Sequence, residues 1–320
     1  MTHNQLFSIT QFIINNWDSS SAWPDFINAM RLVLPKGNGG IAPSKESDRW
    51  ALLPGLCCQA SGGDLDLTEE VSAAWLLLYI AAHLFDSVED RDQVDEIKDL
   101  GGPGSAINVA NGLLLSVSLI LNKLHDKDQT KSKAQQLSSD FYNTVLLMTS
   151  GQHRDINDHQ LTLKQWWKVA EAKSGSFFSL ACRCGAQLVS DDPVKITGYS
   201  DYGFHLGMML QIRDDIEDLK IFLESEIPVN LQRSLAVAYA LEVLPETDKS
   251  QLKELTEITP HEPEMVNRII EILNLSGAGL YMLAEMERHY ESGMTSLKNA
   301  DPYSPAGEKL AALIRELKLD

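Results

Sequence analysis

Cysteine is scarce in this sequence, with four residues among 320. Cys57 and Cys58 are adjacent, and one residue separates Cys182 from Cys184, so neither pair has the wider gap of a zinc site. A chain of this length with 44% apolar residues can bury a substantial core without disulfides. We therefore expect four buried, reduced thiols in a cytoplasmic protein.

Basic residues and long apolar runs are also scarce. The 27 lysines and arginines are outnumbered by 45 aspartates and glutamates, which gives a formal charge of −18. This charge argues against nucleic acids and anionic membrane surfaces as partners. The longest apolar run, at 73–85, has 13 residues, whereas a membrane-spanning helix needs about 20. Residues 1–17 lack the basic start of a signal peptide, so we expect no membrane span and no signal peptide.

Strand patterns are almost absent, and nearly every segment repeats its apolar residues at three- and four-residue spacing. Segments rich in glycine, proline and aspartate separate these repeats. We expect an all-α fold in a single domain spanning 1–320, with N-terminal helices at 1–45, a core at 50–245 and C-terminal helices at 246–320. The expected helices cover roughly 4–17, 22–33, 47–61, 68–90, 104–125, 130–150, 162–190, 195–223, 230–243, 248–257, 262–292 and 304–318.

The stretch LQIRDDIEDLK at 210–220 gathers four carboxylates on one predicted helix: Asp214, Asp215, Glu217 and Asp218. Like charges three or four residues apart destabilise a helix by roughly 0.2–0.5 kcal/mol per pair. A solvated acidic face is one explanation for such a group. A bound cation is the other.

A second group of carboxylates, at the end of the apolar segment 68–90, repeats this spacing. Asp86, Glu89 and Asp90 stand at positions i, i+3 and i+4, as do three carboxylates of the first group. Mostly buried helices cannot end in such charge without a counter-ion. Carboxylates offer hard oxygen ligands, which select magnesium, manganese or calcium, and magnesium favours a few carboxylates plus substrate phosphates. The two groups therefore predict a diphosphate bridged by metal to both helices.

Five segments resemble, in order, the motifs of the trans-isoprenyl diphosphate synthase family of class I isoprenoid synthases. FDSVED at 85–90 resembles the first D-D-x-x-D motif, with Ser87 in the second place, and YGFHLGMMLQIRDDIEDL at 202–219 resembles the G-x-x-x-Q-x-x-D-D-x-x-D motif. LLPGLCCQASGG, SGQHRDI and KSGSFFSLACRCGAQL are similar to the helix before the first motif and to the G-Q and K-T-G segments. Within SGQHRDI we expect Arg154 to pair with Asp155. The resemblance covers about residues 50–245.

The resemblance implies a helical bundle around a central cavity, a homodimer, and an allylic prenyl diphosphate as substrate. It also implies magnesium, with manganese as a possible replacement. The implied metal ligands are Asp86, Asp90 and Asp214, with Glu89, Asp215 and Asp218 completing the acidic rims.

The resemblance also assigns catalytic and substrate-binding side chains. Lys173 would neutralise the diphosphate, and Gln211 would form a hydrogen bond near the reacting carbons. Arg213, Lys220 and Arg233 are near enough to the second motif in sequence to reach the diphosphate. The expected apolar contacts are Phe177 and Phe178 in the cavity wall, for which ordinary core packing is the alternative, and Phe85 at the cavity floor.

Two segments depart from the family where its chain-elongating members bind isopentenyl diphosphate through basic residues. Ser47 and Asp48 occupy the places of one basic patch, and Asp95 and Glu96 replace paired arginines in the other. A diphosphate that faces carboxylates loses charge-assisted hydrogen bonds of roughly 1.5–3 kcal/mol each. These replacements favour a reaction without isopentenyl diphosphate.

Three hypotheses remain open at this point. The favoured one is an enzyme that ionises one allylic diphosphate and then closes it into a terpene or transfers it to another acceptor. The second is a prenyl diphosphate synthase that binds isopentenyl diphosphate through other residues, such as Arg49, Arg91 or Lys98. The third is a non-catalytic subunit of such an enzyme, although both acidic motifs are retained. The D-x-x-E-D form also resembles squalene and phytoene synthases, which makes head-to-head condensation a minor alternative.

Overall fold

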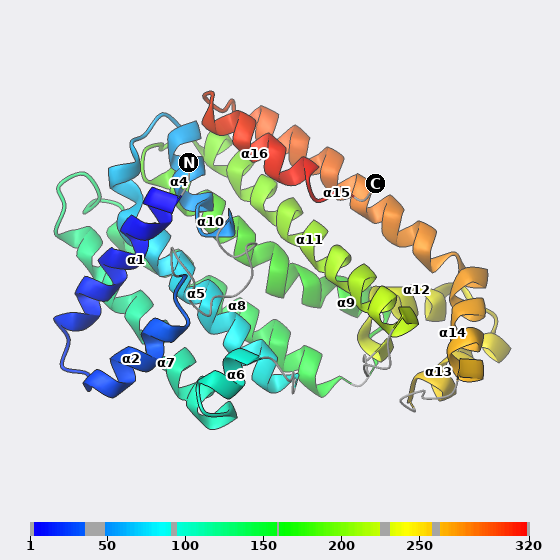
Figure 1. Ribbon diagram of the computed structural model, residues 1–320. Coiled ribbons are helices and arrows are strands. Elements are labelled where there is room, and N and C mark those ends of the chain that lie inside the picture. The colour runs from blue at the N-terminus through cyan, green and yellow to red at the C-terminus, as the bar shows by residue number, and fades with distance from the viewer. Residues whose placement is uncertain are drawn as a thin grey trace. The chain divides into compact units, whose positions relative to one another are not determined.

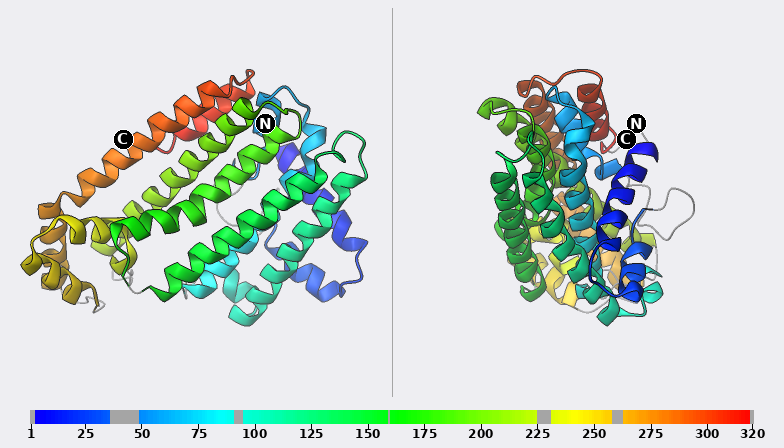
Figure 2. Two further views of the ribbon diagram at one scale, coloured as in Figure 1. Left: turned by 180° about the vertical axis from the view of Figure 1, so that it is seen from behind. Right: turned by 90° about the vertical axis from the view of Figure 1, so that its left-hand side faces the viewer.

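The computed structural model describes residues 3–35, 49–90, 95–158, 160–224, 231–257 and 263–318. These residues form helices and turns and contain no strand, which confirms the predicted all-α class (Figures 1 and 2). The α-helices are α1 (His3–Asp18), α2 (Pro24–Leu32), α4 (Leu53–Ala60), α5 (Glu69–Glu89), α6 (Asp95–Asp99), α7 (Pro103–Asn122), α8 (Ala134–Asn157), α9 (Leu163–Ala170), α10 (Ser176–Gln187), α11 (Pro193–Glu224), α12 (Leu235–Val243), α13 (Glu246–Glu257), α14 (Pro263–Ser276), α15 (Ala278–Asn299) and α16 (Ala306–Arg315).

The chain divides into two compact units, each built from three segments. The first contains 1–142, 181–199 and 300–309, and the second contains 143–180, 200–299 and 310–320. Four helices, α8, α10, α11 and α16, contribute residues to both units. The single domain and the central cavity expected from the sequence stay predictions.

The core of the first unit is built on α5, which packs along α7 (Figure 1). The first half of α5 is buried around nearly its whole circumference, as its continuous apolar sequence predicts. Trp75 is fully buried there, and its indole nitrogen donates to the carbonyl oxygen of Trp50 at 3.0 Å. The buried carboxylate of Glu70 is neutralised by Lys127, whose ammonium lies 2.6 Å away. This helix carries the first acidic group at its C-terminal end.

All four cysteines are free thiols buried in the first unit, as expected. Cys57 lies on α4, and burial together with the neighbouring Cys182 thiol raises its pKa well above the usual value. The backbones of α4 and α10 approach closely because Gly185 has no side chain. A Cβ at this position would lie 2.2 Å from the carbonyl oxygen of Pro54.

Two helices of the first unit are long and apolar enough to cross a membrane, judged by length and composition alone. They are 65–89, which includes α5, and 103–125, which includes α7; the pair α14 and α15, bent by 55°, would make a third. The most apolar windows of the first two are 67% and 44% buried inside the fold. The expectation of no span counted only uninterrupted apolar runs, and it missed helices in which isolated polar residues interrupt the apolar sequence.

Two predicted helices are divided in the structure. The segment expected at 162–190 contains a π-helical turn, Glu171–Gly175, between α9 and α10. The helix expected at 262–292 is interrupted at Gly277, whose φ of 76° separates α14 from α15. Short α6 was not expected, and α8 continues seven residues beyond its predicted end at 150.

Candidate active site

The second acidic group lies on α11, and its carboxylates occupy different environments. Asp214, Glu217 and Asp218 are exposed, whereas Asp215 is only 8% exposed. Arg213 is partly exposed and donates through Nε to Glu217 at 2.8 Å, one turn further along the helix. The substrate contact expected for Arg213 therefore stays a prediction, because the described ion pair is on its own helix.

The carboxylate of Asp215 points to the start of α12. Its Oδ2 accepts the backbone N–H of Leu235, the first helical residue after the N-cap Ser234. Burial raises the pKa of Asp215 to about 7, and the carboxylates of Asp218 and Asp214 add to this rise. The hydrogen bonds from Leu235 and Gln211 act in the opposite direction. Asp215 therefore differs from its exposed neighbours in the acidic rim expected from the sequence.

Gln211 connects α11 to the π-turn. Its Oε1 accepts a hydrogen bond of 2.7 Å from the hydroxyl of Ser174, and its side chain also bonds to Asp215. The two segments approach closely because position 207 is glycine. A Cβ on Gly207 would lie 2.2 Å from the carbonyl oxygen of Ser174. The Gln211 amide thus has protein partners on both sides, and its expected contact with reacting carbons stays a prediction.

Lys173 lies in the π-turn, and its ammonium donates to Oδ2 of Asp155 at 2.7 Å. Both side chains are about one-fifth exposed, at 20% and 19%. π-helical turns are rare and occur often at functional sites. The turn thus carries a lysine that is paired with Asp155 and still partly exposed.

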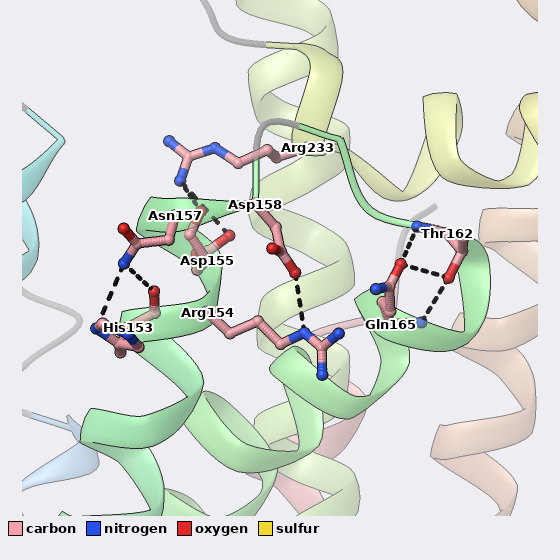
Figure 3. A network of polar contacts seen from close by, with 8 residues as sticks. All are labelled: His153, Arg154, Asp155, Asn157, Asp158, Thr162, Gln165 and Arg233. Carbon is pink, nitrogen blue, oxygen red and sulfur yellow. Dashed lines mark hydrogen bonds and ion pairs between the residues drawn. The ribbon is translucent and has the colours of Figure 1, made fainter.

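Asp155 also binds Arg233, which lies in the short turn Leu231–Arg233 before α12 (Figure 3). The guanidinium Nη1 lies 2.6 Å from the backbone oxygen of Asp155 and 3.6 Å from its Oδ1. The expected pairing of Arg154 with Asp155 is wrong, because Arg154 donates to Asp158 at 3.0 Å. One carboxylate thus holds two cations that come from segments about 60 residues apart in sequence. Sequence analysis did not assign Asp155 to the site.

The chain around Asp155 is fixed by local hydrogen bonds, also drawn in Figure 3. Asn157 at the end of α8 donates to the backbone oxygen of His153 at 2.7 Å. Thr162 and Gln165 form a reciprocal capping box that starts α9. These contacts fix the end of α8 and the start of α9.

The first acidic group lies at the C-terminal end of α5, in the first unit. Asp86 is half-buried, Glu89 and Asp90 are exposed, and the backbone N–H of Asp90 donates to the backbone oxygen of Asp86 at 2.8 Å. Ser87, which interrupts the acidic motif, is buried at 3% exposure. Phe85 is half-buried beside it.

The segments expected to reject isopentenyl diphosphate are only partly described. Ser47, Asp48 and Arg91 lie outside the described residues. Asp95 and Glu96 begin α6, and the exposed Asp95 pairs with Lys98 at 3.2 Å. The carboxylate of Asp95 therefore has a cation of its own helix beside it.

The donor chemistry of the two acidic groups fits a hard divalent cation, although neither forms a complete cage. Within the described ranges, no group of three or more histidine, cysteine, aspartate or glutamate side chains is placed to hold a metal ion. Magnesium needs only one or two carboxylates when water and substrate phosphates supply the other ligands. Asp86 with Asp90, and Asp214 with Asp218, each provide two carboxylates one helical turn apart.

Phe177 and Phe178 follow the π-turn on α10 and are buried, at 7% and 5% exposure. Their rings form a T-shaped pair with centroids 5.6 Å apart. This arrangement is what core packing would give, so their place in a substrate cavity stays a prediction.

Comparison of the sequence with known proteins shows which family and which relatives it is similar to. The sequence model of the family described as polyprenyl synthetase matches residues 57–273. A short chain isoprenyl diphosphate synthase from Methanothermobacter thermautotrophicus is 24% identical over 271 residues, 81% of each chain. The tryptophan prenyltransferase ComQ from Bacillus subtilis subsp. natto is 26% identical over 157 residues, which are 49% of this chain and 47% of ComQ.

Solved structures share the fold over almost the whole chain. The geranylgeranyl pyrophosphate synthetase from Pyrococcus horikoshii has a TM-score of 0.82 at 18% identity, covering 98% of this chain and 95% of its own. A geranylgeranyl pyrophosphate synthase from Corynebacterium glutamicum, complexed with calcium and isoprenyl diphosphate, has a TM-score of 0.74 at 21% identity, with coverage of 98% and 95%. At these identities the likeness establishes the all-α fold.

Proposed function

The chain belongs to the polyprenyl synthetase family, whose members are prenyltransferases acting on allylic diphosphates, and we propose that it is a prenyl diphosphate synthase that joins an allylic diphosphate to isopentenyl diphosphate. The observation that carries the proposal is the convergence of Lys173 and Arg233 on Asp155, inside the matched residues 57–273. Asp95 and Glu96 favour a reaction without isopentenyl diphosphate, and this proposal reverses that preference. The relative from Methanothermobacter thermautotrophicus, matched over 81% of both chains, supports the reversal.

In the proposed reaction, the carbon–oxygen bond of the allylic diphosphate breaks and the diphosphate leaves with the bonding electrons. Lys173 and Arg233 would take up the negative charge that develops on its oxygens. Asp155 would hold both cations in place before the substrate arrives. The allylic carbon would then bond to the terminal alkene carbon of isopentenyl diphosphate, and loss of a proton would restore a double bond.

We assign magnesium, or manganese in its place, to Asp86 and Asp90 in the first acidic group and to Asp214 and Asp218 in the second. When bound, the metal would act as a Lewis acid on the diphosphate oxygens. Glu89 would complete the acidic rim beside Asp86 and Asp90. Asp90, Asp214 and Asp218 are exposed and Asp86 is half-buried, which supports the assignment, since a substrate diphosphate has to reach the same cation.

A second candidate function is prenyl transfer to an acceptor other than isopentenyl diphosphate, or closure of the allylic chain into a terpene. Asp95 and Glu96 favour it, because carboxylates at the position of paired arginines would repel a second diphosphate. The partial match to ComQ, whose name gives tryptophan as the acceptor, also supports it.

We further propose that the enzyme is a soluble, cytoplasmic homodimer. One face of α7 exposes Ile107, Leu115 and Leu119, at 40%, 68% and 62%. Such a stripe is typical of a surface covered by a second copy. The proposed dimer would also explain why α7 is as apolar as a membrane helix while less than half of its most apolar window is buried in the described fold.

The test is to incubate purified protein and magnesium with geranyl, farnesyl and geranylgeranyl diphosphates, each with and without isopentenyl diphosphate. Mass spectrometry would identify the organic products. Longer diphosphates formed only with isopentenyl diphosphate support the proposal, whereas a hydrocarbon or alcohol from the allylic substrate alone supports the second candidate. Lys173→Ala should abolish either product, and Lys253→Ala, which changes an exposed lysine of α13, should not. Absence of every product would favour a non-catalytic subunit or an untested acceptor.

A further inference from the structure

The four carboxylates of the second acidic group differ in their exposure to solvent, and Asp215 is the buried one. Adjacent residues on a helix point about 100° apart, so Asp214 and Asp215 cannot both face the same side. Asp214, Glu217 and Asp218 lie on the exposed side of α11. Asp215 lies on the buried side, at 8% exposure.

Asp215 accepts hydrogen bonds from two directions. The backbone N–H of Leu235 donates to its Oδ2, and the side chain of Gln211 bonds to it from one turn earlier on α11. The carbonyl oxygen of Gln211 already accepts from Ser174 at 2.7 Å, so the group that bonds Asp215 is the Gln211 amide NH₂. A continuous chain of donors therefore runs from Ser174 through Gln211 to Asp215.

The two ends of this chain are next to the two cations of the site. Ser174 follows Lys173 in the π-turn. Leu235 lies two residues after Arg233, and the N-cap Ser234 lies between them. Asp215 thus ties together the two backbone segments that carry Lys173 and Arg233.

We propose that Asp215 is a positioning residue, which fixes the turns that carry Lys173 and Arg233, and that it does not bind metal. This inference rests on the proposed function, because it assigns a role within the same site. Metal binding in the second acidic group falls to Asp214 and Asp218. A carboxylate that accepts from Leu235 and Gln211 inside the protein would have to break both hydrogen bonds and move to the surface to reach a cation.

The first test uses Asp215→Asn and Asp214→Asn, with Asp218→Asn as a third variant. Asparagine keeps the shape of the side chain, but its amide NH₂ would face the NH₂ of Gln211 or the N–H of Leu235. We expect Asp215→Asn to lower the unfolding midpoint while the affinity for Mn²⁺, followed by electron paramagnetic resonance, changes less than about twofold. Asp214→Asn should weaken Mn²⁺ binding by about tenfold or more and leave the midpoint nearly unchanged. Equal losses of Mn²⁺ affinity in both variants would overturn the proposal.

Hydrogen exchange provides a readout that does not depend on metal or turnover. Asp215→Asn should speed amide exchange by about tenfold or more in both 171–175 and 231–236. Gln211→Ala should act on 171–175 alone, because Leu235 contacts Asp215 directly and does not depend on Gln211. Unchanged exchange in both segments of Asp215→Asn would also overturn the proposal. If the wild-type protein bound no Mn²⁺ and turned over no substrate, the proposed function would fail, and the exchange data would still decide the role of Asp215.

Discussion

The imidazole Nδ1 atoms of His205 on α11 and His289 on α15 lie 2.9 Å apart, so one ring donates an N–H hydrogen bond to the other. Arg288 determines the direction, because its guanidinium lies 3.0 Å from Nε2 of His289 and can only donate. His289 therefore carries its proton on Nδ1, and this N–H donates a hydrogen bond to Nδ1 of His205. Trp167 of α9 stacks on the His289 ring, with centroids 5.8 Å apart. Both histidines are neutral in this arrangement, since an added proton would place two N–H groups against each other.

The first prediction is that the contribution of His205 and His289 to stability falls as the pH falls below 6.5. Burial and Arg288 lower the pKa of His205 from 6.5 to about 4 and that of His289 to about 3, and His205 adds to the lowering for His289. Between pH 6.5 and 4 the unfolded chain takes up protons that the folded chain does not. Each histidine therefore removes about 1.4 kcal/mol of unfolding free energy per pH unit at most. Urea unfolding at pH 7.5, 6 and 5 measures this slope.

A matched pair of variants isolates the two histidines from other titrating groups. The double change His205→Asn with His289→Asn should flatten the slope between pH 6.5 and 4. His125→Gln, which removes an exposed histidine after α7, should leave it unchanged. If the double variant keeps the wild-type slope, the neutral pair is not the cause.

The second prediction concerns Asp155. Asp155→Asn removes the negative charge that holds Lys173 and Arg233, so we expect the turnover of the allylic diphosphate to fall by about tenfold or more. Asp158→Asn removes a carboxylate three residues away that binds only an exposed arginine in the described contacts, and it should have little effect. Steady-state rates of both variants test this, and equal rates would refute the role of Asp155.

The third prediction concerns the close approach of α11 and the π-turn. Gly207→Ala would place a Cβ 2.2 Å from the carbonyl oxygen and 2.8 Å from the carbonyl carbon of Ser174. Since these are backbone atoms, the helices have to separate, and we expect a loss of about 1–3 kcal/mol or more in unfolding free energy. Gly279→Ala on α15 meets nothing within 4 Å and should change stability by about 1 kcal/mol or less. Urea midpoints of the two variants compare directly, and similar midpoints would show that α11 can move without cost.

The fourth prediction tests the proposed dimer. Leu115→Glu places a negative charge in the exposed apolar stripe of α7. In a symmetric dimer both copies carry the change, so the interface receives two charges. We expect the dissociation constant to rise by about tenfold or more. Analytical ultracentrifugation measures it, with Thr197→Glu, an exposed position on α11, as the charge control. A wild-type protein that sediments as a monomer would rule out the dimer.

The fold class and the acidic groups could be predicted from the sequence because both depend on local spacing. Apolar residues at three- and four-residue intervals define helices without any long-range information. The buried state of the four cysteines was likewise accessible, since isolated thiols in an apolar context are seldom exposed.

The partners of Asp155 could not be predicted, because Lys173 and Arg233 reach it from other helices. A neighbouring arginine in the sequence suggested a local pair, but Arg154 and Asp155 point to different sides of α8. The burial of Asp215 did leave a signal. It falls on the stripe of Met208, Ile212 and Phe222, at the three- and four-residue spacing of a buried face. A carboxylate in that stripe indicates a protein partner more than a surface ligand.

The π-turn at Glu171–Gly175 sets the angular phase between α9 and α10. A π-turn holds one residue more than an α-turn in about the same rotation, so every later side chain lies about 100° behind the place it would have in a continuous α-helix. Trp166 faces the core before the turn, and Phe177 and Phe178 face it afterwards. A continuous α-helix that held all of these residues would turn those rings by about 100° from their present direction. The π-turn therefore decides which side chains of α10 face the core and which face away from it.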